Sequence, residues 1–74
     1  MEKLSKEEFQ IALGENIRKI RTSLGITQRA LALDCNMEPA SINKIEKGKV
    51  NTSAFTLHCI CKSLGVQYSD LLEV

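Results

Sequence analysis

The spacing of apolar residues along the chain predicts a series of short amphipathic helices. An apolar residue recurs every three or four positions across residues 9–24, as expected for one face of a helix, at Phe9, Leu13, Ile17, Ile20 and Leu24. Ser5 and Glu8 have the spacing of a capping box, so this helix should begin near Lys6 and end before Gly25. Gly14 lies inside it, where glycine costs about 1 kcal/mol relative to alanine.

Residues 27–48 predict two further helices joined by a tight turn. Thr27 is a suitable N-cap for the first helix, and Asn36 tolerates the left-handed conformation that ends it. Pro39 fits the first position of the second helix, and Gly48 would terminate that helix. The residues expected in the core from these two helices are Leu31, Ala32, Cys35, Ile42 and Ile45.

Residues 51–72 predict a fourth helix and a short fifth one. Asn51 opens a run of three capping-type residues, and we expect it to cap the fourth helix, which Gly65 would end. The apolar face of the fourth helix should consist of Phe55, Leu57, Ile60, Cys61 and Leu64. Tyr68, Leu71 and Leu72 would lie on the fifth helix.

These elements predict an all-α fold, a compact five-helix bundle. A length of 74 residues favours one domain over residues 1–74 with a small core, in which residues 1–12 extend the first helix. Because no apolar run has membrane-spanning length and the N-terminus is charged, we expect no membrane span and no signal peptide. Three cysteines without a secretory signal suit a reducing environment, so we expect a cytoplasmic protein.

Four segments in order carry a family resemblance. They read L-G-E-N-I-R-K-I-R, then L-G-I-T-Q-R-A-L-A, then I-N-K-I-E-K-G-K, then T-L-H-C-I-C-K-S-L-G-V-Q-Y-S-D-L-L. Together they resemble the Xre (phage repressor, Cro/C1-type) family of helix-turn-helix DNA-binding domains. The resemblance implies a lambda-repressor-like fold and a transcriptional regulator, such as a repressor, that binds double-stranded DNA as a homodimer. It implies no cofactor and no small-molecule ligand.

The resemblance also assigns roles to individual residues. The helix at about 39–47 would lie in the major groove. Its base-reading positions would be Pro39, Ala40, Ser41, Asn43 and Lys44. The residues meeting DNA phosphate would be Thr27, Gln28, Arg29, Lys47, Lys49, Asn51, Thr52 and Ser53. Arg21 and Glu46 would form a structural ion pair, and the dimer interface would include Tyr68, Leu71, Leu72 and Val74.

The charge distribution agrees with a nucleic-acid partner. Residues 16–49 carry seven basic and three acidic side chains, whereas the remainder carries three basic and six acidic ones. The half of the chain that contains the helix-turn-helix pattern is therefore the basic half.

Other functions stay open beside DNA reading. Pro39 and Ala40 offer only apolar contacts to bases, which would suit a protein-interaction module, for example an antitoxin-type or accessory partner, that keeps the fold with weak DNA reading. Leu33 would be either a surface leucine or a partner contact.

The histidine and the cysteines suggest two further alternatives, a metal site and a thiol sensor. Cys59 and Cys61 lie about 200° apart on a helix, so both cannot ligate one ion together with His58. A thiol sensor would use Cys35 or one of these two cysteines. No constellation of nucleophile, base and phosphate loop appears, so we expect no enzyme activity and no metal site.

Overall fold

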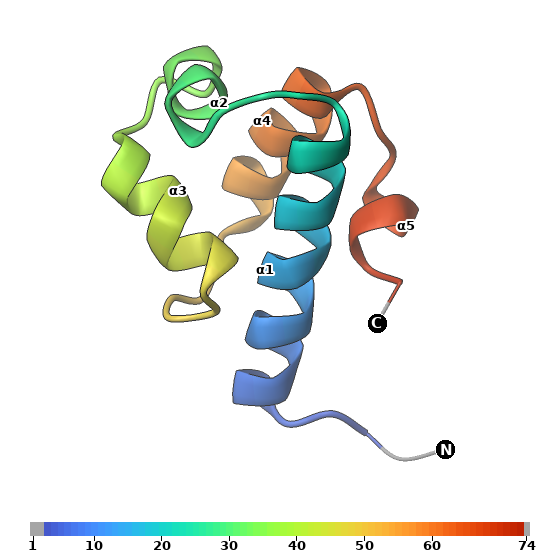
Figure 1. The fold of residues 1–74 in the computed structure, drawn as a ribbon. Coiled ribbons are helices and arrows are strands. Elements are labelled where there is room, and N and C mark those ends of the chain that lie inside the picture. The colour runs from blue at the N-terminus through green and yellow to red at the C-terminus, as the bar shows by residue number, and fades with distance from the viewer. Residues whose placement is uncertain (1–2, 74) are drawn as a thin grey trace.

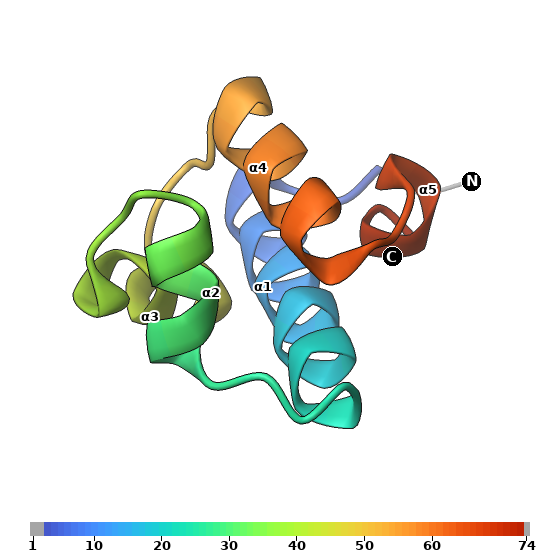
Figure 2. The same ribbon diagram turned by 90° about the horizontal axis from the view of Figure 1, so that it is seen from above.

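The computed structural model describes residues 3–73, and these form five α-helices without any strand. The helices are α1 (Lys6–Ser23), α2 (Gln28–Asp34), α3 (Pro39–Glu46), α4 (Ala54–Leu64) and α5 (Tyr68–Leu71). The long α1 lies in the middle, with α2 and α3 on one side and α5 on the other (Figures 1 and 2). The predicted all-α, five-helix architecture is therefore confirmed. No helix within residues 3–73 has the length and apolarity needed to cross a membrane.

The helix ends follow from local capping chemistry. Ser5 and Glu8 form both hydrogen bonds of the predicted capping box, and the Thr27 hydroxyl accepts from the Ala30 amide. Asn36 adopts the predicted left-handed conformation, with φ of 55°, in the turn between α2 and α3. Ser53, and not Asn51, caps α4, since the Ser53 hydroxyl accepts from the Thr56 amide. The first turn of α4 therefore begins later than expected.

The core lies where α1, α2, α3, α4 and α5 meet. Its buried apolar residues are Leu13, Ile17, Leu31, Ala32, Cys35, Ile42, Ile45, Ile60, Cys61, Leu64 and Leu71. Two residues that the sequence pattern placed on buried faces are exposed instead, namely Leu24 and Phe55. Leu24 follows the last turn of α1, and Phe55 lies in the first turn of α4. At both helix ends the apolar stripe continues onto exposed positions.

Two glycines allow the chain to pass close to α1. A Cβ atom on Gly14 would lie 2.6 Å from the Glu46 carbonyl oxygen, so α3 crosses α1 at a distance that only glycine permits. A Cβ atom on Gly48, whose φ is +71°, would lie 2.6 Å from the Ile11 Cα. Gln10 Nε2 also donates to the Gly48 carbonyl at 3.2 Å. The first turns of α1 therefore hold the segment that follows α3.

The α5 helix closes the opposite side of the molecule. Leu71 is fully buried, and the Asn16 side chain donates to the backbone carbonyls of Leu71 and Glu73, each at 3.0 Å. Leu71 is thus a core residue, which corrects its assignment to a dimer interface. Val74, also assigned to that interface, lies outside the described residues.

Candidate nucleic-acid interface

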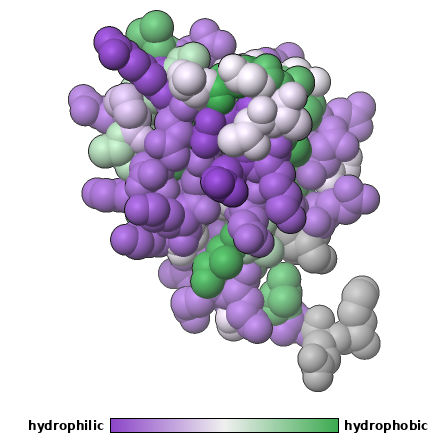
Figure 3. All heavy atoms as spheres, viewed as in Figure 1, coloured by the Kyte–Doolittle hydropathy of each residue, from purple (hydrophilic) through white to green (hydrophobic). Residues whose placement is uncertain are grey.

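The α3 helix is anchored on one face and open on the other. Ile42 and Ile45 are buried in the core. The positions expected to read bases share the opposite side: three are exposed (Pro39, Ala40 and Lys44) and two are half-buried (Ser41 and Asn43). In the view of Figure 1, where α3 lies at the left, the surface is mainly hydrophilic, with separate apolar patches (Figure 3). A helix presented in this way can enter the major groove of DNA.

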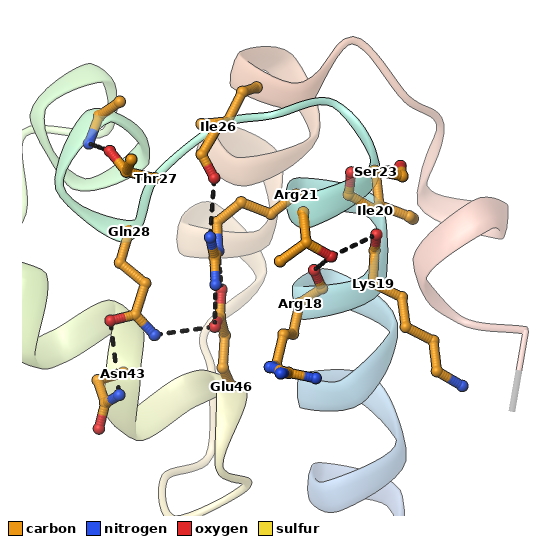
Figure 4. Close-up of polar contacts among 12 residues, drawn as sticks. Arg18, Lys19, Ile20, Arg21, Ser23, Ile26, Thr27, Gln28, Asn43 and Glu46 are labelled. Atoms are coloured by element: carbon orange, nitrogen blue, oxygen red, sulfur yellow. Dashed lines mark hydrogen bonds and ion pairs between the residues drawn. The ribbon is translucent and has the colours of Figure 1, made fainter.

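A buried ion pair holds the end of α3 against α1. Arg21 Nε donates to Glu46 Oε2 at 2.6 Å and Arg21 Nη2 donates to Glu46 Oε1 at 3.0 Å, the bidentate geometry of strong arginine–carboxylate pairs (Figure 4). The two side chains are only 10% and 2% exposed. Arg21 Nη1 also donates to the Ile26 carbonyl at 2.8 Å. The hydrogen bonds to Glu46 raise the pKa of Arg21, so the guanidinium stays charged.

Gln28 joins this network, contrary to the expectation that its side chain meets DNA phosphate. Gln28 Nε2 donates to Glu46 Oε1 at 2.9 Å, and Gln28 Oε1 accepts from Asn43 Nδ2 at 3.5 Å. Both polar ends of the side chain are therefore turned toward other residues of the protein (Figure 4). The sequence predicts that Gln28 lies at the start of α2, but it does not show where the side chain points. In the structure the Glu46 carboxylate, which can accept several hydrogen bonds, also accepts one from Gln28.

The side chains expected to meet phosphate fall into two groups. Arg29, Lys47 and Lys49 are exposed cations, and Asn51 is an exposed amide. The capping hydroxyls are already engaged: Thr27 accepts from the Ala30 amide, and Ser53 both accepts from the Thr56 amide and donates to the Thr56 hydroxyl at 3.0 Å. At Thr27 and Ser53, the backbone amides that open each helix are the donors left for an anion.

A surface groove lies between α3 and the start of α4. Its lining includes Ser41, Lys44, Asn51, Thr52 and Ser53, of which Ser41 and Lys44 were expected to read bases and the other three to contact phosphate. The two predicted groups of residues therefore come together along one edge of α3. Polar donors beside a cation suit a sugar-phosphate strand.

An acidic residue stands at the start of α3. Glu38 occupies the N-cap position and is exposed, and among the described residues its side chain makes no capping hydrogen bond. Glutamate is a poor N-cap compared with serine, asparagine or aspartate. Its carboxylate lies next to Pro39, a position expected to face bases, and sequence reasoning did not single out this acidic residue beside the expected DNA surface.

Two of the three thiols, those of Cys35 and Cys61, are buried, and that of Cys59 is half-buried. Burial raises the pKa values of Cys35 and Cys61, which disfavours the thiolate that oxidation and metal binding require. Over residues 3–73, no three side chains of metal-ligating type come together. Leu33 is 80% exposed at the end of α2, and both interpretations of this leucine remain consistent with that position.

An aromatic row on α4 and α5 was only partly expected. Tyr68 and Leu72, assigned to the dimer interface, are 45% and 42% exposed. Beside them His58 Nδ1 lies 3.1 Å from the Tyr68 hydroxyl, and the His58 ring centroid lies 6.2 Å from that of Phe55. Phe55 is 74% exposed. The spacing of apolar residues placed Phe55 on the buried face of the fourth helix, so the sequence did not predict its exposure.

Comparisons with known proteins agree with this geometry. The profile of the helix-turn-helix family HTH_3 matches residues 17–71. Control protein C.BamHI of Bacillus amyloliquefaciens is 37% identical over 66 residues, which cover 88% of this chain and 82% of that protein. The crystal structure of the clp gene regulator ClgR from C. glutamicum superposes with a TM-score of 0.87 at 30% identity, over 96% of this chain and 91% of that one. The restriction-modification controller protein C.Esp1396I gives a TM-score of 0.79 at 31% identity, over 88% and 84% of the two chains.

Proposed function

Because the chain belongs to the helix-turn-helix family HTH_3 of DNA-binding transcriptional regulators, we propose that it reads a specific DNA sequence as a homodimer. Each protomer would act as one DNA-binding domain with α3 in the major groove. The observation that carries the proposal is the presentation of α3, whose apolar face is buried while Pro39, Ala40 and Lys44 stand exposed. Relatives of two kinds, restriction-modification controllers and a clp gene regulator, have regulation in common.

Lys44 would carry most of the direct readout. Its ammonium group can donate to guanine O6 and N7, whereas Pro39 and Ala40 can only touch a thymine methyl group. Ser41 and Asn43 would assist from the edge of α3. Lys44 lies one turn of helix beyond Ala40, so it faces the same groove.

Phosphate contacts would fix the register of α3 on the duplex. The exposed cations Arg29, Lys47 and Lys49 would neutralise backbone charge, and Asn51 and Thr52 would donate from the far side of the groove beside α3. The backbone amides at the starts of α2 and α4 would contribute in place of the Thr27 and Ser53 hydroxyls. Such contacts give affinity without sequence preference.

Dimerisation would use the surface on the other side of α1 from α3. Tyr68 and Leu72 supply exposed apolar area there, and Phe55 and His58 extend it along α4. Because α3 and α5 lie on opposite sides of α1 (Figures 1 and 2), a two-fold pair formed through α5 would keep both recognition helices free. Two half-sites on one face of DNA are spaced by about 34 Å, one helical turn.

Selection from a random duplex pool followed by two matched substitutions tests the proposal. Lys44→Ala should relax preference at particular base pairs by about 1–3 kcal/mol, whereas Lys47→Ala should weaken binding evenly and lower the salt slope by about one unit. If no sequence is enriched, the chain does not read DNA specifically, and the protein-interaction alternative gains support. If Lys44→Ala weakens the selected and scrambled duplexes equally, Lys44 contacts phosphate only.

Sedimentation of the free protein and of its DNA complex tests the homodimer. Phe55→Glu should reduce self-association because it places charge on the exposed aromatic row, whereas Leu24→Glu, at an exposed leucine after the last turn of α1 and outside that row, serves as the matched control. A protein that sediments as a monomer at high concentration and also on its selected duplex would contradict dimeric binding.

A further inference from the structure

Polar side chains extend the buried ion pair to the open side of α3. Arg21 pairs with Glu46 in the interior, Gln28 Nε2 donates to Glu46 Oε1 at 2.9 Å, and Asn43 Nδ2 donates to Gln28 Oε1 at 3.5 Å (Figure 4). Glu46 is buried, whereas Gln28 and Asn43 are half-buried. Four side chains therefore connect a fixed charge in the core with a residue that faces the proposed DNA surface.

The charge of Glu46 fixes the orientation of both amides. An ionised carboxylate can only accept hydrogen bonds, so Gln28 has to turn its NH₂ group toward Glu46 and its carbonyl oxygen toward Asn43. The reverse orientation of the Asn43 amide would set two carbonyl oxygens against each other. At 3.5 Å the hydrogen bond between Asn43 and Gln28 is weak, but this repulsion still selects one orientation.

The outward group of Asn43 is consequently its carbonyl oxygen. Figure 4 shows the Asn43 nitrogen on the side of Gln28 and the Asn43 oxygen on the side away from it. An outward acceptor matches the exocyclic amino groups of adenine and cytosine in the major groove. Guanine O6 and thymine O4 are acceptors themselves, and a carbonyl oxygen held against them would be repelled.

We propose that this relay makes Asn43 select adenine or cytosine over guanine or thymine on the strand that it faces, and that Gln28 is the positioning residue that sets this preference. The proposal rests on the function proposed above. An asparagine without the relay could rotate its amide and donate to guanine or thymine instead. Gln28 would thus influence base choice without touching a base.

Duplex binding and side-chain NMR together test the relay. Asn43→Ala first identifies the base pair at which discrimination depends on Asn43. Four duplexes that differ only at that pair are then titrated with the wild type, with Gln28→Met and with the adjacent control Arg29→Met. Gln28→Met should lower discrimination at this pair about fivefold or more, which is the lower end of a direct base contact. Arg29→Met should weaken all four duplexes equally.

In the free protein, Gln28→Met should shift the Asn43 side-chain NH₂ resonances and speed their exchange with solvent. Gln28→Ala repeats the comparison if the methionine variant does not fold. The relay is overturned if the Asn43 resonances do not change, if Gln28→Met keeps full discrimination, or if the wild type prefers guanine or thymine at the identified pair. If no duplex is preferred while the resonances still change, the proposed function fails and the base selection fails with it, but the contact between Gln28 and Asn43 stands.

Discussion

Replacing Glu46 with alanine measures how strongly the buried ion pair holds α3 to α1. The variant leaves the Arg21 guanidinium, whose side chain is 10% exposed, without its carboxylate, and leaves the Gln28 amide without its acceptor. Removing one partner of a buried pair costs about 3–5 kcal/mol. A chain of 74 residues has a total free energy of unfolding of about 4–11 kcal/mol. Glu46→Ala should therefore remove at least a quarter of the stability and in the worst case unfold the domain.

Urea and thermal unfolding provide the assay. For a domain of this size 1 kcal/mol lowers Tm by about 4–8 °C, so Glu46→Ala should lower Tm by about 12 °C or more. Arg21→Lys keeps the charge but cannot form the bidentate pair and the bond to the Ile26 carbonyl together, so its loss should be smaller but clear. The double variant Arg21→Met with Glu46→Leu removes both charges and should be more stable than either Arg21→Met or Glu46→Leu alone.

Two results would refute this reasoning. A loss of 1 kcal/mol or less in Glu46→Ala is the value for an exposed pair, and it would mean that solvent reaches Arg21. If the double variant lost as much free energy of unfolding as the two single variants lose together, the two residues would not be coupled. Because the pKa of Arg21 is raised on folding, its contribution is complete below the ordinary arginine value and is lost only as pH rises through the raised one. The pH of a neutral assay should therefore not alter the contribution of Arg21.

Three further predictions concern the helices themselves. Gly14→Ala should destabilise the fold by about 1–3 kcal/mol in urea, since the new Cβ meets the backbone of α3; a raised midpoint, as helix propensity alone would give, would contradict this. Glu38→Ser should add about 0.5–1 kcal/mol by capping α3 and should also tighten DNA binding, while Glu38→Gln changes only the binding. The hydrogen bond from the Ser5 amide lowers the pKa of Glu8, so its stabilisation is present above the ordinary carboxyl pKa and lost as pH falls through the lowered value; Glu8→Gln should flatten the acid side of the stability profile.

The periodicity of apolar residues located the helices because each helix of residues 3–73 buries one face against α1 or against a helix packed on it. It could not show how far along each helix that face remains covered. Phe55 continues the stripe of α4 and Leu24 that of α1, yet both side chains are exposed. Coverage is a property of the packed molecule, and the sequence of one helix does not contain it.

Some features of the candidate site could likewise be predicted from the sequence and others could not. The pairing of Arg21 with Glu46 followed from family resemblance, since nothing in the spacing of these two residues requires it. The inward turn of Gln28 could not be expected, because it depends on an acceptor 18 positions away along the chain. By contrast, the exposed side of α3 was predicted well, because burying Ile42 and Ile45 determines which positions of a helix face outwards.

The position of the polar network explains how so small a core can present a recognition helix firmly. Gly14 lets α3 approach α1 so closely that no larger side chain fits between the two backbones. The bidentate pair at Glu46, in the last turn of α3, adds directional bonds to the apolar contacts there. The start of α3 has only a weak cap at Glu38. The pair thus fixes to α1 the last turn of α3, which also carries Lys44, the residue proposed to read bases.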